Sequence, residues 1–523
     1  MKRLIVGLLA LSLAFGAASA QTLIYGQSDL PKTLDSSDAQ DGNSLRVAFQ
    51  ITETLVTFKP GTVDPIPGLA VSWEAGNNAK EWTFKLRQGV KFHDGTPFNA
   101  EAVKFNIDRW NDPNNKYRGN KQFVPFTWVF GGFKGDGSII DHVDVVDEYT
   151  VKFYLTDSVG FFPNMLGASY FGIDSPKAVM ANPDKYGTPE VGAVGTGPFV
   201  FDKWVIGDKV VLKRNDNYWG EKAKVDTLVF RGIPEPASRL AELKAGAIDI
   251  ANNLSPEDKV TIDADPNLQA VVQQGLNIGY LAFHQQNKPL DDIRVRKAIA
   301  AAVDWDAIVD AFYAGLGERA TEFVPPAMWG RDGNIPAYTY NPELAKKLLA
   351  EAGYPNGFET EIWYMPVSRP YFPAPQPIAE TIATYLADVG IKATLKTEDW
   401  GTYLSDYDQG KFPMYMLGWS PDYPDPDNYL FTFFGPTSIK TNLGCESDAC
   451  QQIGEMLVQA RTAPDMATRK ELYAKVQRMV HELTLSIPVA HNNPLHAVRK
   501  GVEGWVPSPL GSSENLNLVT VNK

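Results

Sequence analysis

The chain has 523 residues, of which 49 are Lys or Arg and 62 are Asp or Glu, so its formal net charge is −13 at pH 7. A net negative charge of this size disfavours binding to nucleic acid and to anionic membranes. Hydrophobic residues make up 44% of the chain, with 12 Trp, 21 Tyr and 27 Phe, which is enough apolar surface for two or three domains of ordinary size.

The first twenty residues have the three parts of a secretory signal peptide. A basic start precedes the apolar run Leu4–Gly16, and Ala18-Ser19-Ala20 forms a cleavage site of small residues. The run is too short to span a membrane, and no later stretch reaches about 18 unbroken apolar residues. We therefore predict cleavage after Ala20. No cysteine follows the cut to carry a lipid anchor, so we expect a soluble periplasmic protein and a monomer.

Strand-like and helix-like segments alternate in the first half of the mature chain. In Glu81–Phe92, Trp82, Phe84 and Leu86 recur at every second position, which predicts a strand. A helix with Asn99 as its N-cap follows. Val143–Leu155 is typical of a β-hairpin.

The second half alternates more regularly. The pattern predicts helices over Ile293–Gly315, Asn341–Tyr354 and Pro377–Gly390, and strands over Phe358–Met365, Ile391–Thr397 and Lys411–Ser420. Asn341 is the expected N-cap of its helix, with Pro342 at the first helical position. Such alternation indicates an α/β region with helices packed on a sheet.

Two proline-rich loops each follow one of the predicted strands. Pro366–Pro377 contains a single basic residue, Arg369. Trp419–Tyr429 contains three aspartates set between prolines: Asp422, Asp425 and Asp427. Since ligands of open α/β sheets bind beyond the carboxyl ends of the strands, both segments are candidate ligand loops.

The aspartates could serve a metal ion, a proton transfer or a cationic part of a ligand. A calcium loop of the EF-hand type needs Asp-x-Asp-x-Asp-Gly and a closing Glu, whereas this segment has intervening prolines. Loop aspartates are usually solvated or act as caps, which is the favoured interpretation for Asp425 and Asp427. The chain has no GxSxG, HExxH or GxxxxGK[ST] motif. We therefore expect no catalytic residue, no metal and no cofactor.

The chain has two cysteines, Cys445 and Cys450. In an exported protein, such a close pair predicts a local disulfide. A two-ligand metal site is the alternative, but no nearby His completes it.

Several segments in order carry a family resemblance: 82–109, 194–220, 239–250, 291–309, 313–326, 340–358 and 376–404. With them, the sequence resembles the extracellular solute-binding proteins of family 5, the peptide-binding components of ABC importers. The resemblance implies an α/β periplasmic-binding-protein fold of two lobes that close over a ligand. It places the larger lobe at 21–275 and 492–523, with an inserted subdomain at roughly 56–190, and the smaller lobe at 276–491. The crossings are expected near Gly275–Gly279 and Asn492.

Within the family, the dipeptide-binding proteins are the nearest match. Their MPVxRPY segment corresponds to Met365–Tyr371, and their GW-x-x-D segment corresponds to Gly418–Asp422. The resemblance implies that Arg369 binds the carboxylate of the ligand and that Asp422 binds its ammonium. A guanidinium fork matches a carboxylate bidentately, so this assignment is chemically sound.

Three aromatic residues are candidates for the side-chain pockets of the ligand: Tyr371, Trp400 and Trp419. Core packing is the alternative for each, and the stronger one for Trp419.

The sequence thus predicts a periplasmic protein that captures short peptides, most of all dipeptides, and delivers them to an inner-membrane ABC permease without chemical turnover. One alternative is the same fold with another solute, such as haem, glutathione, an opine-like amine or a sugar. Arg369 and Asp422 together disfavour a neutral sugar. A remote alternative is an exported hydrolase that uses Asp422 and Asp425.

Overall fold

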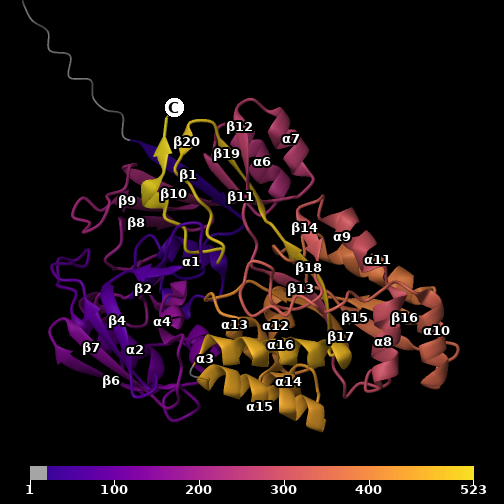
Figure 1. Cartoon of the computed structure of the whole chain (residues 1–523). Helices are drawn as coiled ribbons and strands as arrows, with labels where there is room; N and C mark the ends of the chain where they lie inside the picture. The colour runs from indigo at the N-terminus through magenta and orange to yellow at the C-terminus, as the bar shows by residue number, and fades with distance from the viewer. Residues whose placement is uncertain (1–20, 464, 523) are drawn as a thin grey trace, which may run out of the picture.

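The structure is a computed structural model that describes residues 21–463 and 465–522. The predicted signal peptide and its cleavage site lie outside these residues. The fold is mixed α/β with three main sheets (Figure 1). We call the part built on the seven- and four-stranded sheets the larger lobe, and the part built on the six-stranded sheet the smaller lobe.

The seven-stranded sheet joins both ends of the chain. Its order is β12 (Leu268–Val272), β19 (Leu495–Arg499), β11 (Ile250–Leu254), β1 (Thr22–Gln27), β10 (Thr227–Gly232), β9 (Lys209–Arg214) and β8 (Phe199–Val205). Three helices belong to this part: α1 (Gly42–Ala48), α6 (Pro236–Lys244) and α7 (Asp258–Ala264). Helices α6 and α7 pack on β11 and β12 respectively.

The rest of the larger lobe is built on the antiparallel sheet β4 (Ala70–Gly76), β5 (Glu81–Leu86), β7 (Thr150–Leu155) and β6 (Ile140–Asp147). Its helices are α2 (Ala100–Asn111), α3 (Val124–Phe130), α4 (Phe162–Met165) and α5 (Pro176–Ala181). Short pieces complete the lobe: β2 (Val56–Phe58) with β3 (Pro65–Pro67), β20 (Val502–Glu503) with β21 (Thr520–Val521), and the 3₁₀ turns Ser36–Asp38, Ser169–Phe171 and Leu516–Leu518.

The smaller lobe has a sheet in the order β14 (Gly317–Arg319), β18 (Ser486–Asn492), β13 (Ile278–Phe283), β17 (Met414–Trp419), β15 (Glu359–Trp363) and β16 (Lys392–Lys396). Its first helices are α8 (Ile293–Ala302), α9 (Trp305–Phe312), α10 (Pro342–Glu351), α11 (Pro375–Ala387) and α12 (Trp400–Asp408). Between β17 and β18 come α13 (Asp427–Phe434), α14 (Ser438–Thr441), α15 (Asp448–Thr462) and α16 (Met466–Glu482).

Most predicted elements are present, and local hydrogen bonds explain their ends. The Asn99 side chain accepts a hydrogen bond from Ala102 N at 3.1 Å, and Asn341 accepts one from Leu344 N at 2.9 Å, so both are N-caps as predicted. The strand predicted to reach residue 92 ends at Leu86.

The single helix predicted over 293–315 is wrong, because the structure has two helices there. Val303 adopts an extended conformation, with φ −108° and ψ 132°, and so ends α8. The Asp304 carboxylate then accepts a hydrogen bond from Ala307 N at 3.0 Å and caps α9. An aspartate inside a run of regularly spaced apolar residues can therefore begin a new helix, although the apolar spacing continues past it.

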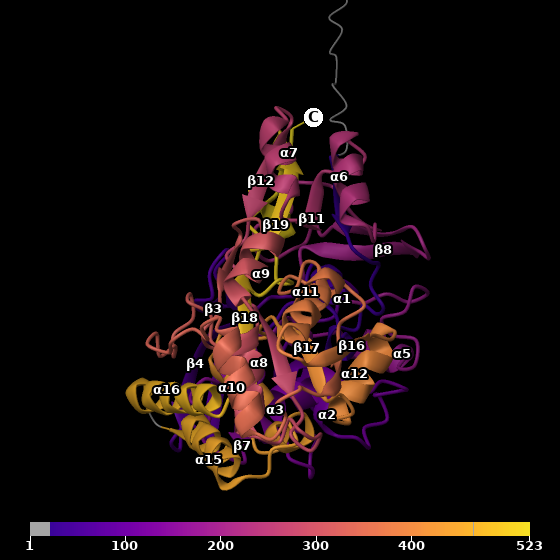
Figure 2. The ribbon, with the colours of Figure 1, turned by 90° about the vertical axis from the view of Figure 1, so that its right-hand side faces the viewer.

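The chain crosses between the two lobes from β12 to β13 and again from β18 to β19. Figure 2 shows β18 and β19 in line, one in each lobe. Asn277 and Asn492 join the two crossings: Asn277 Nδ2 donates to Asn492 O at 2.8 Å, and Asn492 N donates to Asn277 Oδ1 at 3.1 Å. Two reciprocal bonds between buried asparagines keep the crossings side by side.

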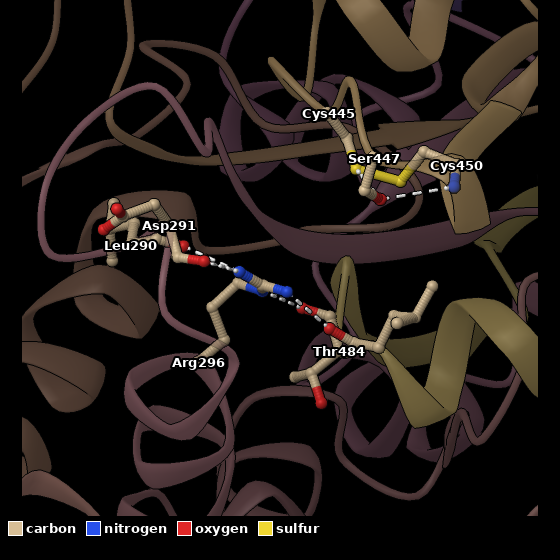
Figure 3. Close-up of a disulfide and its surroundings, with 8 residues drawn as sticks. Leu290, Asp291, Arg296, Cys445, Ser447, Cys450 and Thr484 are labelled. Carbon is tan, nitrogen blue, oxygen red and sulfur yellow. Dashed lines mark hydrogen bonds between the residues drawn. A yellow bond between two sulfur atoms is a disulfide. The ribbon is translucent and has the colours of Figure 1, made fainter. Parts of the chain in front are cut away.

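The predicted disulfide between Cys445 and Cys450 is confirmed, with an S–S distance of 1.99 Å (Figure 3). It closes the connection between α14 and α15. Figure 3 also shows Arg296 of α8, a buried cation that donates to main-chain oxygens of two chain segments, Leu290–Asp291 and Leu483–Thr484. These bonds tie the start of α8 to the end of α16 without a carboxylate.

Candidate ligand site between two loops

The two candidate loops leave the sheet of the smaller lobe at the same end of its strands. Strands β15 and β17 pair in parallel, with Trp363 opposite Tyr415. Parallel strands bring their carboxyl ends together, so the loop that carries Arg369 and the loop that carries Asp422 both start there. The predicted placement of the loops is confirmed.

Arg369 lies in a tight turn and points its charge at an aromatic ring. Its backbone exchanges two hydrogen bonds with Phe372, at 3.1 and 3.0 Å. The guanidinium carbon lies 4.9 Å from the centre of the Trp400 ring, which is cation–π distance. Among residues 21–463 and 465–522, no side chain or carbonyl forms an ion pair or hydrogen bond with this guanidinium. Arg369 is thus a half-buried cation whose donor fork is free for a ligand.

The three aromatic candidates differ in their surroundings. Trp400 is partly exposed at the start of α12, under Arg369 and stacked on Tyr403. Tyr371 is only 7% exposed and belongs to the apolar core of the smaller lobe. Trp419 donates its indole N–H to Asn428 Oδ1 at 2.8 Å and packs edge-on against Phe433. A ligand pocket stays a prediction for all three; Trp400 and Trp419 are both partly exposed, and Trp400 lies within cation–π distance of Arg369.

Asp422 is held by hydrogen bonds and has no cation beside it. Tyr170 OH donates to Oδ1 at 2.9 Å, and Asn428 Nδ2 donates to Oδ2 at 3.3 Å. Asn428 Oδ1 also accepts a hydrogen bond from Asp422 N at 2.8 Å, so the side-chain amide of Asn428 holds both the main-chain N–H and the carboxylate of Asp422. Burial raises the pKa of Asp422 to about 6, although both hydrogen bonds act in the opposite direction. In the described part of the chain, Asp422 forms no salt bridge.

The other two aspartates of the loop are each paired with a buried arginine. Asp425 receives two hydrogen bonds from Arg469, at 2.6 and 3.0 Å. The Asp427 carboxylate accepts hydrogen bonds from Arg461 Nε at 3.1 Å and from Arg461 Nη2 at 2.9 Å. Burial alone would lower the pKa of Arg469, but the Asp425 charge raises it above its ordinary value. Both aspartates are thus buried in ion pairs and are not solvated as expected, although Asp425 also accepts a hydrogen bond from Asp427 N at 3.0 Å at the start of α13.

Pairing therefore separates the three carboxylates that look alike in the sequence. Two are neutralised within the smaller lobe, and only Asp422 is available for a cation. Sequence reasoning missed Arg461, Arg469 and Asn428, which hold the loop, and Tyr170, which reaches it from the larger lobe. The run Asp425–Asn428, a few residues after Asp422, was the one available signal for Asn428; for the other three residues, no local motif points to the loop.

No group of three or more His, Cys, Asp or Glu side chains is placed to hold a metal ion within the residues that the structure describes. Over the same ranges, none of the helices has the length and apolar character needed to cross a bilayer.

Comparisons with known proteins agree with this architecture. The family model of the bacterial extracellular solute-binding proteins, family 5 Middle, matches residues 64–441. A dipeptide-binding protein of Escherichia coli (strain K12) is 35% identical over 99% of this chain and 98% of its own. Heme-binding protein A of Haemophilus influenzae is 34% identical over 95% of this chain and 91% of its own.

The crystal structure of a dipeptide-binding protein from Pseudoalteromonas sp. SM9913 in complex with Met-Leu superposes with a TM-score of 0.86. It is 28% identical to this chain and covers 96% of it, with 100% of that structure matched. This likeness over the full length confirms the two-lobed α/β fold of periplasmic binding proteins. The chain belongs to the bacterial extracellular solute-binding proteins of family 5.

Proposed function

We propose that this protein is the periplasmic binding component of an ABC importer that captures short peptides, above all dipeptides, and presents them to an inner-membrane permease. The observation that carries the proposal is the pair of unmatched charges on neighbouring loops. Arg369 has no carboxylate partner and Asp422 has no cation partner among the described residues, whereas the flanking Asp425 and Asp427 are both paired.

The chemistry of a peptide zwitterion suits this pair. The planar donor fork of Arg369 can hold the terminal carboxylate bidentately, and the Asp422 carboxylate can accept protons of the terminal ammonium. A charge that is taken out of water without gaining a partner is unfavourable, so a ligand that supplies both opposite charges is favoured over one that supplies neither. The names of the relatives, which include dipeptide-binding proteins, support the same ligand class.

Two further parts of the proposal concern the lobes and the lack of turnover. The larger lobe would comprise 21–275 and 492–523, the smaller lobe 276–491, and the two would close over the ligand about the crossings that Asn277 and Asn492 join. We expect no catalysis, since the family is one of solute-binding proteins and two of the three aspartates, Asp425 and Asp427, are held in buried ion pairs. We also expect the mature protein to be a periplasmic monomer.

Haem is a second candidate because one relative, at 34% identity, is a heme-binding protein. Haem carries two carboxylates and no ammonium. Arg369 would suit a propionate, but Asp422 would meet no cation and would repel the second propionate. The charges of the site therefore favour the peptide.

Native mass spectrometry of the protein purified from periplasm tests the proposal. We expect a bound mass that corresponds to one dipeptide or a mixture of dipeptides. Calorimetry on the refolded, ligand-free protein should then show binding of alanyl-leucine. Absence of heat with alanyl-leucine, together with a haem absorption band on titration with haem, would overturn the proposal in favour of haem.

A further inference from the structure

One residue of the larger lobe touches the anchor of the ligand ammonium. Tyr170 belongs to the 3₁₀ turn Ser169–Phe171, whereas Asp422 belongs to the loop between β17 and α13 in the smaller lobe. The phenol oxygen of Tyr170 lies 2.9 Å from Asp422 Oδ1 and donates its proton to it. This bond therefore spans the two lobes.

The phenol is held in place from its own lobe. Its ring lies edge-on to the ring of Trp128, with the centres 6.3 Å apart, and Tyr170 O accepts a hydrogen bond from Ser36 Oγ at 3.1 Å. Tyr170 is only 7% exposed, while Trp128 beside it is 41% exposed. Burial raises the pKa of Tyr170, and the charge of Asp422 adds to the shift, so the phenol keeps its proton.

A second contact between the lobes starts one residue after Asp422. Tyr423 is 1% exposed and belongs to the apolar cluster of the larger lobe, where it stacks on Phe161 with the ring centres 6.1 Å apart. Its own hydroxyl stays within the smaller lobe and donates to Asp427 Oδ2 at 2.9 Å. Separating the lobes would thus withdraw the Tyr423 ring and break the Tyr170–Asp422 bond in the same step.

The chemistry of an ammonium explains what Tyr170 adds. An ammonium has three protons to donate, and Asp422 already accepts one bond on each of its oxygens. A phenol oxygen that donates one bond still has lone pairs with which to accept another. Tyr170 can therefore donate to Asp422 and accept from the ligand at the same time.

We propose that Tyr170 is the larger lobe's part of the ammonium site, a specificity residue that makes capture of a free α-amine depend on closure of the two lobes. The inference rests on the proposed function. In the open protein, Asp422 holds the amine without the phenol, while Asn428 only fixes the position of the carboxylate; on closure, the Tyr170 phenol adds a further acceptor. Ligands without a free α-amine gain nothing from Tyr170.

The test compares Tyr170→Phe with Tyr186→Phe. Tyr186 is the matched control because it is also buried and also donates its phenol proton to a buried aspartate, Asp174, at 2.7 Å, but within one lobe. Alanyl-leucine and N-acetyl-alanyl-leucine are the probes. Calorimetry measures the affinity for alanyl-leucine. Competition against a fluorescently labelled dipeptide measures the weaker affinity for N-acetyl-alanyl-leucine. Far-UV circular dichroism and the thermal midpoint verify that each variant is folded.

We expect Tyr170→Phe to weaken alanyl-leucine about tenfold or more, through faster dissociation, since a hydrogen bond to a charged group is lost from the closed state. The affinity for the acetylated peptide should change much less, so the ratio of the affinity for alanyl-leucine to that for its N-acetyl form should decrease. Tyr186→Phe should leave both affinities unchanged.

Each other outcome has a distinct meaning. If wild-type protein binds no dipeptide, the proposed function fails and this inference falls with it. If wild-type binds alanyl-leucine and Tyr170→Phe binds it equally well, only the inference is overturned. Equal losses for the free and acetylated peptides would also overturn it, because they would show a structural role without amine recognition.

Discussion

Gly279 and Gly418 lie opposite each other on the antiparallel strands β13 and β17. A Cβ atom on Gly418 would come within 2.1 Å of the Tyr371 ring, and one on Gly279 would come within 2.7 Å of Tyr371 O. Two facing strands thus lack side chains at the place where the Arg369 loop lies on them. The paired glycines set how closely that loop approaches the smaller sheet.

Gly418→Ala should therefore displace the Arg369 loop. We expect a loss of about 1–3 kcal/mol in the free energy of unfolding from overpacking, together with weaker dipeptide binding. Urea denaturation and calorimetry measure the two effects. Gly42→Ala is the control, because a Cβ there meets nothing within 4 Å. A Gly418→Ala protein with the stability and affinity of Gly42→Ala would contradict the close approach.

Arg369→Ala should abolish dipeptide binding and leave the ligand-free thermal midpoint nearly unchanged. The guanidinium supports no hydrogen bond or ion pair among the described residues, and its contact with Trp400 is worth only about 0.5–1 kcal/mol. Arg369→Lys keeps the charge without the fork, so it should retain weak binding. Arg294→Ala, which removes an exposed arginine paired with Asp292, serves as the control. Full affinity in Arg369→Ala would show that the carboxylate anchor is misassigned.

Dipeptide affinity should fall on the acid side because of Asp422. With Asp422 buried against Tyr170, as in this structure, the pKa of this carboxyl is raised to about 6, so below that pH an ammonium that enters the site must displace a proton. We expect constant affinity at pH 7–7.5 and a decline of up to about tenfold per pH unit below about 6. Calorimetry at several pH values measures it.

The same carboxylate should distinguish free from blocked amines. Asp422→Asn should weaken alanyl-leucine far more than its N-acetyl form and should remove the acid-side decline. Equal losses for both peptides, or an unchanged pH profile, would reject the ammonium role.

Stability should depend on pH through Asp174, far from the ligand loops in sequence. Tyr186 OH donates to Oδ1 at 2.7 Å, while Arg109, at 3.8 Å from Oδ2, is already bound to Asp35. Burial, followed by the charge of Asp35, raises the pKa of Asp174 to about 8. The unfolded value is about 3.9, so the folded state holds the proton more tightly.

The contribution of Asp174 is therefore fully present below about pH 4 and is lost as pH rises through 8. The free energy of unfolding of Asp174→Asn should fall less than that of wild type between pH 5 and 9, by at most about 1.4 kcal/mol per pH unit. Urea denaturation across this range measures the difference. Parallel curves for the two proteins would mean that Asp174 is ionised in the folded state at all these values.

Short-range signals predicted the local elements and the edge of the sheet where the loops lie. The N-caps Asn99 and Asn341, the strands before each loop and the close cysteine pair all depend on residues a few positions apart. The break between α8 and α9 was missed because the apolar period continues through Asp304.

The partners of the loop could not be predicted in the same way. Asp425 meets Arg469 from 44 positions away, and Asp422 meets Tyr170 from 252 positions away. No spacing rule connects such residues, since tertiary packing alone brings them together. The sequence could therefore identify three aspartates on a rigid loop, but their pairing is what separates Asp422 from the other two.

The place of β19 in the larger sheet has a consequence for the order in which the chain can fold. This late strand lies between β11 and β12 and pairs with both. Beyond it, the buried Glu514 pairs with Arg46 at 3.0 Å. A chain that is made N-terminus first presents β11 and β12 long before β19 exists. Until then, the facing edges of β11 and β12 are unpaired and Arg46 lacks its counter-charge. A chain that stopped before β19 would keep both strand edges exposed, and exposed edges favour pairing with other chains.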